Sequence, residues 1–337
     1  MVSTVPLSVL DLAIVGRDET VADSLAGCVR MAQRAETLGY SRVWYAEHHN
    51  MSSIASSATA VLIAHVAAHT TTIRLGSGGV MLPNHAPLVI AEQFGTLATL
   101  HPGRIDLGLG RAPGTDQVTL RALRRDPMAA DSFPQDVIEL QGYVADETRV
   151  PTIHATPGRG THVPIYILGS SLFGAQLAAM LGLPYAFASH FAPAALEAAM
   201  RMYRSEFQPS EQLAEPYAIA AVNVIAAPTL EEAELQRVMR RRALGRRMLT
   251  RGGQQLDDAQ IDAILDTPDG SFVDEMMTYT ACGAPGDVRA YLEEFQRFTA
   301  ADELMTVHQG GVVDDRILSL TLTAQAMDLR TTIWRRV

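Results

Sequence analysis

The chain has 337 residues, of which 47% are hydrophobic and 19% charged, and its 27 basic against 37 acidic residues give a net charge of −10. These values are ordinary for a globular protein and exclude a disordered, collagen-like or coiled-coil chain. The acidic balance disfavours nucleic acid as a partner, and the apolar runs are far shorter than the roughly 20 residues that cross a bilayer, so we expect no membrane partner either.

Predicted strands and helices alternate from the N-terminus onward. Residues 21–38 carry apolar side chains at intervals of three and four and are followed by Gly39, which predicts a helix that ends there. Pro87 favours the first turn of a second helix, which runs to about Leu100. The other elements predicted in this half are strands at residues 7–12, 42–46, 73–76 and 104–109 and an alanine-rich helix at residues 55–69.

The same alternation continues in the second half and gives roughly eight strand–helix units, the number that closes a (β/α)8 TIM barrel of about 250 residues. Long connections at residues 111–134, after strand four, and 251–281, after strand seven, predict two insertions, the second rich in loops. Composition changes nowhere along the chain, so residues 1–337 are predicted to form a single barrel domain. The elements of this half are strands at residues 163–168, 185–189, 217–226 and 303–307 and helices near 173–181, 193–207, 287–298 and 314–330.

An open, doubly wound α/β sheet is the alternative architecture. Its dinucleotide-binding fingerprint places the pattern GxGxxG directly after the first strand. The nearest match in this chain, residues 108–114, follows the fourth strand and is one residue too long. The barrel is therefore the favoured fold.

All 27 basic residues are arginine, which excludes chemistry that requires a lysine, such as a Schiff base or a P-loop. An anion must then be held by arginine, backbone N–H groups or hydroxyls. The basic run at residues 237–251 is interpreted as a solvated helix face. Two cysteines, Cys28 and Cys282, are too few for a disulfide framework, and no basic segment precedes the first apolar stretch, so a cytoplasmic protein is predicted.

Loops at the C-terminal ends of barrel strands form the active-site face, and the second strand is followed there by Glu47, His48 and His49. These residues suit general acid–base chemistry, because imidazole titrates near neutral pH. Adjacent histidines on an extended chain point to opposite faces, and no companion metal-binding motif follows, so no metal site is expected. The alternative is that one histidine faces the site while the other packs beneath it.

Two glycines end the third strand, and a histidine follows the sixth. Gly78 and Gly79 favour the close approach of a flat ligand to the backbone, although a simple turn is the alternative. His190 lies at the corresponding end of the sixth strand. We expect all three residues to face the ligand.

An anion site is predicted where Arg111 follows the fourth strand and where Ser170, Ser171 and Gly174 lead from the fifth strand into a helix. A guanidinium binds phosphate with two parallel hydrogen bonds, and the free N–H groups of a helix N-terminus favour anions. Taken singly, the arginine also fits a surface ion pair and the serines a helix cap. Together they favour phosphate binding.

These residues lie within five ordered blocks in which the chain resembles the bacterial luciferase-like flavin-dependent monooxygenase family, in its branch of short single-component sequences. The resemblance runs nearly end to end and is weakest at residues 251–281. It implies a (β/α)8 barrel that binds FMN with the isoalloxazine ring over the end of the third strand, where a non-prolyl cis peptide at Gly78 and Gly79 lets the ring approach. The blocks are VWYAEHHN (43–50), LGSGGVMLPNHAPLVIAEQFGTL (75–97), HPGRIDLGLGRAPGTD (101–116), ILGSSLFGAQLAAMLGLPYAFASHF (167–191) and CGAPGDV (282–288).

The resemblance also assigns roles to residues. The family's phosphate-binding arginine matches Arg111, and the histidine pair that supports turnover in luciferases matches His48 and His49, preceded by Glu47. Gly110 replaces a reactive cysteine of the luciferase branch and Ser170 an acidic residue, which argues against light emission and long-chain aldehyde use. The expected cofactor-binding residues are Gly78, Gly79, Arg111, Ser170, Ser171, Gly174 and His190.

The implied activity is that of a flavoprotein oxidoreductase. Reduced FMN, used as a cosubstrate and supplied by a separate flavin reductase, would react with O2 and oxidise a small organic substrate through a flavin peroxide. His48 or His49 would move protons, and a homodimer through the helices at 55–69 and 87–100 is expected.

Three alternatives stay open. The first is hydride transfer with a deazaflavin, which would require further arginines near the mouth that the sequence does not identify. The second is a non-catalytic flavin-binding protein. The third is a metal-dependent barrel hydrolase.

Overall fold

The computed structural model describes residues 5–112, 115–249 and 256–329, and within them eight parallel strands close into a barrel. Each strand pairs with the next, β6 pairs with β7, β7 with β9, and β9 with β1, so the ring has no free edge. The predicted (β/α)8 barrel is confirmed, and the open doubly wound sheet is wrong. The barrel strands are β1 (Leu7–Asp11), β2 (Arg42–Tyr45), β3 (Arg74–Met81), β4 (Ile105–Gly110), β5 (Ile165–Gly169), β6 (Tyr185–Phe187), β7 (Ala218–Ala226) and β9 (Glu303–His308).

A ninth strand, β8 (Thr280–Gly283), was not predicted. It pairs with residues 223–226 of β7, beyond the point where β6 ends, and stays outside the ring. Four residues that include a glycine are too short a run for strand periodicity to be recognised. The connection before it, expected to be rich in loops, carries α9 (Asp258–Leu265) and α10 (Ser271–Met276) in its described part.

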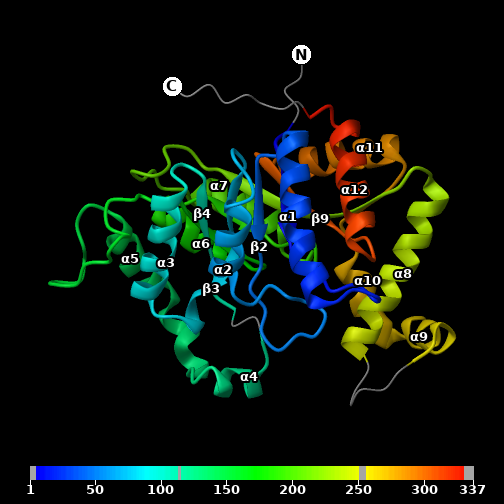
Figure 1. The fold of residues 1–337 in the computed structure, drawn as a ribbon, viewed down its shortest axis with the longest axis horizontal. Helices are drawn as coiled ribbons and strands as arrows, with labels where there is room; N and C mark the ends of the chain where they lie inside the picture. Colours follow the sequence, from blue (N-terminus) through cyan, green and yellow to red (C-terminus); the bar gives the residue numbers. More distant parts are fainter. Residues whose placement is uncertain (1–4, 113–114, 250–255, 330–337) are drawn as a thin grey trace.

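Helices surround the barrel (Figure 1), and the predicted signals mark two of their ends, Gly39 after the first helix and Pro87 at the start of the third. The first helix begins after Thr20, whose side chain accepts a hydrogen bond from the N–H of Asp23, and ends at Gly39 with a left-handed φ of 88°. The helices are α1 (Val21–Leu38), α2 (Thr59–Ala67), α3 (Pro87–Leu100), α4 (Gln117–Ala122), α5 (Phe133–Val144), α6 (Leu172–Leu181), α7 (Leu196–Glu206), α8 (Leu230–Leu249), α9, α10, α11 (Pro285–Thr299) and α12 (Val313–Ala326), with 3-10 turns η1 (Leu82–Asn84), η2 (Pro127–Ser132) and η3 (Pro268–Gly270).

An ionic cluster fills the barrel near the N-terminal ends of the strands. Arg42, the first residue of β2, bonds through Nη1 to Asp106 of β4 at 2.8 Å and through Nη2 to Glu303 of β9 at 3.0 Å. The hydroxyl of Tyr166 accepts from Arg42 at 2.7 Å, and that of Tyr217 donates to Glu303 at 2.6 Å. Both carboxylates are completely buried, and each is paired with Arg42. We call this paired cluster the floor of the barrel.

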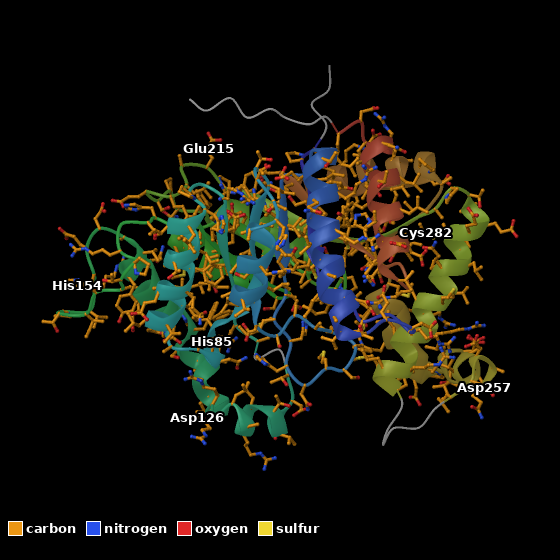
Figure 2. All side chains as sticks on the ribbon, in the orientation of Figure 1. His85, Asp126, His154, Glu215, Asp257 and Cys282 are labelled. Atoms are coloured by element: carbon orange, nitrogen blue, oxygen red, sulfur yellow. The ribbon has the colours of Figure 1, made fainter. Side chains whose placement is uncertain are left out.

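Both insertions lie at the other end of the barrel. The segment with α4 follows β4 and lies at the bottom of the view in Figure 1. The segment with α8, α9 and α10 follows β7, and in the same view α8 runs down the right-hand side towards α9 at the lower right. Figure 2 shows Asp126 and Asp257, one from each insertion, at this same end together with His85. The insertions therefore build up the rim of the barrel's C-terminal mouth. No described helix combines the length and apolar character needed to span a membrane.

Candidate active site

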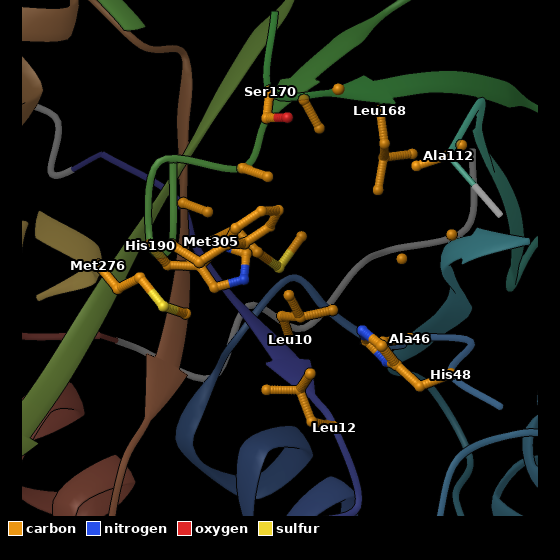
Figure 3. A pocket seen from close by; sticks show the side chains of 18 of the residues that line it. Leu10, Leu12, Ala46, His48, Ala112, Leu168, Ser170, His190, Met276 and Met305 are labelled. Atoms are coloured by element: carbon orange, nitrogen blue, oxygen red, sulfur yellow. The ribbon is translucent and has the colours of Figure 1, made fainter. Parts of the chain in front are cut away.

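A cavity of about 960 Å³ opens at the C-terminal ends of the strands. This volume is at the upper end of the roughly 300–1,000 Å³ typical of small-molecule sites. Its walls are mainly apolar, as Figure 3 shows for Leu10, Leu12, Leu168, Met276 and Met305. The structure brings all seven expected cofactor-binding residues to this cavity, together with His48, whereas Glu47 and His49 are not among the lining residues.

The end of β3 is shaped to receive a flat group. The peptide bond between Gly78 and Gly79 is cis, as the family resemblance implied. A Cβ atom on Gly78 would lie 2.7 Å from Cδ1 of Leu10, and one on Gly79 would lie 2.9 Å from the carbonyl oxygen of Gly108. At Gly79 the obstacle is backbone, and at Gly78 the side chains of Leu10 and Trp44 would have to shift, so in this sequence the backbone itself forms this part of the wall.

Arg111 and the start of α6 form a site with positive character. The guanidinium of Arg111 stacks on the ring of Phe173 at 4.3 Å, and its Nε donates to the carbonyl of Ala130 at 3.2 Å. Ser171 precedes α6 without a side-chain cap bond, so its hydroxyl and the first helical N–H groups stay available to a ligand. The ion pair with Asp131 is exposed and long, at 3.6 Å, and leaves most donors of Arg111 free.

Glu47 is a buried acceptor beneath the cavity. It accepts hydrogen bonds from Nε2 of His49 at 2.9 Å, Nε2 of His85 at 2.8 Å and the N–H of Met81 at 3.0 Å. Burial alone would raise the pKa of Glu47, but these donors outweigh it and hold the pKa below its usual value. Glu47 therefore connects the loop after β2 to the end of β3. Because neighbouring side chains of an extended chain point to opposite sides, His48 lines the cavity and His49 does not.

Two neutral imidazoles face the cavity. Burial, followed by the nearby charge of Arg247, lowers the pKa of His48, and burial, followed by His48 and Arg240, lowers the pKa of His190 to about 3. Nδ1 of each ring is buried and has no hydrogen-bond partner among the described residues. Both uncharged rings line the cavity and can form hydrogen bonds with a bound molecule, and of the two the strongly lowered pKa of His190 makes it the weaker proton acceptor.

Several lining residues were missed by the sequence analysis. Arg240 and Arg247 of α8 line the cavity, although their basic run was interpreted as a solvated helix face. Their spacing of seven residues, with Leu244 between them, is the signal that could have identified a helix face turned inward. Asn223 and Gln309, which bond to each other at 2.5 Å, also line it.

Aromatic side chains also contribute to the site. Trp44, Phe133 and Phe191 contribute to its wall. Tyr279 packs on Phe295 instead, with ring centroids 5.1 Å apart.

Residues 6–302 match the family model described as "Luciferase-like monooxygenase". A protein of Bacillus subtilis (strain 168), "Uncharacterized protein YvbT", is 49% identical over 94% of this chain and 95% of its own length. The "Luciferase-like monooxygenase" of Escherichia coli (strain K12) is 46% identical over 97% of both chains. The "N-acetyl-S-alkylcysteine monooxygenase" of Bacillus subtilis (strain 168) is 40% identical over 69% of this chain and 71% of its own.

Solved structures share the fold. The crystal structure of apo-MsnO8 superposes with a TM-score of 0.87 and 35% identity, covering 97% of this chain and 99% of that one. A type II Baeyer–Villiger monooxygenase in complex with FMN (TM-score 0.68, 16% identity, 96% and 97% coverage) has the same fold. So does an F420-dependent secondary alcohol dehydrogenase (TM-score 0.69, 16% identity, 97% and 99% coverage). On its sequence and its fold alike, this chain belongs to the luciferase-like monooxygenase family.

Proposed function

We propose that this enzyme is an FMN-dependent monooxygenase that uses reduced FMN and O2 to oxidise a small organic substrate. The observation that carries the proposal is the pairing, in one cavity, of a side-chain-free wall at Gly78 and Gly79 with an anion site at Arg111 and the start of α6. A planar ring with a single phosphate tail needs both features. The relative named as an N-acetyl-S-alkylcysteine monooxygenase supports oxygenation as the reaction class.

The residues of the cavity fit FMN. A ring placed against Gly78 and Gly79 meets backbone where any Cβ would collide, and a phosphate finds the Arg111 guanidinium and the hydroxyls of Ser170 and Ser171. Gly174 in the first turn of α6 keeps that helix close to β6, because a Cβ there would lie 3.3 Å from Cε2 of Tyr185. These residues would hold the cofactor at both ends.

When bound, reduced FMN supplies the electrons that activate O2. The chain's own residues do the remaining work. Arg111 neutralises the phosphate, the apolar walls around Leu10, Ile219 and Met305 exclude water, and His48 holds or moves a proton. His190 stays neutral and offers a hydrogen bond to the bound molecule. Glu47 is a positioning residue, since it fixes the loop that carries His48 and does not line the cavity.

A deazaflavin-dependent hydride transfer is the second candidate, because two further arginines, Arg240 and Arg247, do line the cavity. A deazaflavin carries additional anionic groups that they could bind. Titration of the protein with FMN and with F420, followed by fluorescence, separates the two candidates. We expect saturable binding of FMN, and preference for F420 would replace the proposal with its alternative.

The variant Arg111→Ala tests the proposed phosphate site. We expect its FMN affinity to fall by about tenfold to a hundredfold, since hydrogen bonds to charged groups contribute on that scale. Arg121→Ala is the matched control, because Arg121 lies on α4 in the same insertion and its side chain bonds only the carbonyl of Gln117 among the described residues. A wild-type protein without saturable FMN binding would refute the proposed function.

We further propose that a separate flavin reductase supplies the reduced FMN and that the enzyme is a homodimer through α2 and α3. The outer faces of these helices expose Val61, Val89 and Leu100.

In reductase-coupled assays, O2 uptake linked to an oxidised product supports an enzyme. Release of all consumed O2 as hydrogen peroxide supports a flavin-binding protein.

A further inference from the structure

Helix α8 carries two groups of arginines with opposite surroundings. Arg241, Arg242 and Arg246 form ion pairs with aspartates of the α9–α10 segment, among them Arg241 Nε with Asp274 at 2.7 Å and Arg242 Nη2 with Asp262 at 2.6 Å. These pairs hold α8 against the rest of its insertion. The other group, Arg240 and Arg247, lies seven residues apart on the face that lines the cavity.

Neither cavity arginine has a partner of opposite charge in the described part of the chain. No hydrogen bond or ion pair joins Arg240 or Arg247 to another described residue, and Nε of Arg240 is buried without a partner. The residues outside the described ranges contain no aspartate or glutamate. Burial, together with the charges of Arg247 and Arg316, lowers the pKa of Arg240 to about 9, so it is still charged at neutral pH.

The unpaired arginines lie near the histidines of the cavity. The charge of Arg247 acts on His48 and that of Arg240 on His190, which places the pair on the same side as the two free imidazole nitrogens. Figure 3 shows Ser170, part of the proposed phosphate site, well separated from His48 and Leu12. Arg240 and Arg247 come from α8, whereas the proposed phosphate site is built from Arg111 after β4 and from the start of α6, so one phosphate bound there would leave the two arginines of α8 without an anion.

Arg240 is half-buried with its Nε unpaired and Arg247 is exposed, and both line the cavity, so an anion bound there would supply the charge partner that they lack. We propose that Arg240 and Arg247 bind a carboxylate of the substrate, so that this enzyme acts on organic acids with an apolar body. The carboxylate would lie between α8 and the histidines, and the apolar part would pack on Leu12, Ile54 and Met276. The inference rests on the proposed function for the reaction, but the binding of the acid can be measured without turnover.

Isothermal titration of hexanoate and octanoate, each compared with its primary amide, tests the proposal. The titrations use the full-length protein both without cofactor and loaded with oxidised FMN. We expect each acid to bind the wild-type protein about tenfold or more tighter than its amide, because only the acid forms charge-assisted hydrogen bonds. The variants Arg240→Gln and Arg247→Gln should abolish this preference while leaving FMN affinity unchanged.

Arg237→Gln is the matched control, since Arg237 lies on α8 but pairs with Glu234 at 2.6 Å outside the cavity. It should keep the preference of the wild-type protein. Equal binding of acid and amide to the wild type, absence of acid binding, or an unchanged preference in both cavity variants would overturn the inference. Loss of F420 affinity in the cavity variants, without any preference for acids, would assign the arginines to a deazaflavin and also overturn it.

The two proposals fail in different ways. Preference for the acids without FMN binding would refute the proposed cofactor and retain the carboxylate site. FMN binding without preference for the acids would retain the proposed cofactor and refute the carboxylate site.

Discussion

The two ends of the barrel use the same residue type in opposite ways. At the N-terminal floor, Arg42 is bonded to Asp106 and Glu303 inside the ring. At the C-terminal mouth, Arg240 and Arg247 line the cavity without a carboxylate from the described residues. The difference is one of pairing: the arginine at the floor is neutralised by buried carboxylates of the barrel itself, whereas the arginines at the mouth have no carboxylate partner among the described residues.

The sharpest test at the mouth is His48→Gln. If His48 holds or moves the proton in the reaction, the rate of substrate oxidation should fall by about a hundredfold to ten-thousandfold, with little change in unfolding free energy. His49→Gln is the matched neighbour, because His49 bonds Glu47 and points away from the cavity. Steady-state O2 uptake and product formation measure both variants. A larger loss of rate in His49→Gln than in His48→Gln would reverse the assignment.

The matching test at the floor is Arg42→Ala. Removal of the guanidinium leaves Asp106 and Glu303 buried without their counter-ion, which should lower the free energy of unfolding by about 3–5 kcal/mol. Urea denaturation measures the change. Arg201→Ala, which breaks an exposed pair with Glu197, should cost less than about 1 kcal/mol. A loss as small for Arg42 as for Arg201 would show that the floor does not stabilise the barrel.

Much of the fold could be predicted because local signals coincide with real boundaries. The helix α1 (Val21–Leu38) has the predicted ends, since Thr20 and Gly39 cap it through their own chemistry. Helix α2 (Thr59–Ala67) is shorter than the predicted residues 55–69, and its first residue has no side-chain cap to mark it. The strand β8 escaped prediction because its only support is pairing with β7, which is a tertiary contact.

The residues of the site also divide into those that local signals predict and those that depend on tertiary packing. Gly78, Arg111 and Ser170 follow barrel strands directly, so the rule that strand ends carry the active site was enough to select them. Arg240 and Arg247 lie on a helix of an insertion, and which arginines of that basic run face inward depends on the rotation of α8. The seven-residue spacing marks one common face of α8, but the direction in which this face points is fixed by the packing of α8 on α9 and α10, which is a tertiary contact.

The buried histidine of the mouth should make stability depend on pH. The pKa of His190 is about 3 in the folded protein against 6.5 for an ordinary histidine, so the unfolded chain binds the extra proton between these values. Stability from this residue is complete above about pH 6.5 and is lost as the pH falls. His190→Gln should therefore weaken the fall in unfolding free energy between about pH 7 and pH 5 by about 1–2 kcal/mol.

Urea midpoints at the two pH values measure this effect. His162→Gln is the control, because His162 is an exposed histidine on the loop before β5 and pairs with Asp146 at 3.2 Å. An unchanged pH dependence in His190→Gln would show that the pKa of His190 is the same in the folded and the unfolded protein. The mouth would then gain a third positive group as the pH falls below about 6.5.

The smallest change in the free energy of unfolding should come from Arg240→Gln. The sign of this change distinguishes the mouth from the floor of the barrel most directly. Because Arg240 is desolvated and repelled by Arg247 and Arg316, its replacement removes an unfavourable charge and should leave the free energy of unfolding unchanged or raise it by up to about 1 kcal/mol. Urea denaturation at low and high salt measures the change, and added salt should shrink the difference by screening the repulsion. A loss of stability comparable to that of Arg42→Ala would mean that Arg240 has a structural partner, and the mouth would then resemble the floor. A gain in stability combined with lost affinity for carboxylic acids is the signature of a charge retained for its ligand and not for the fold.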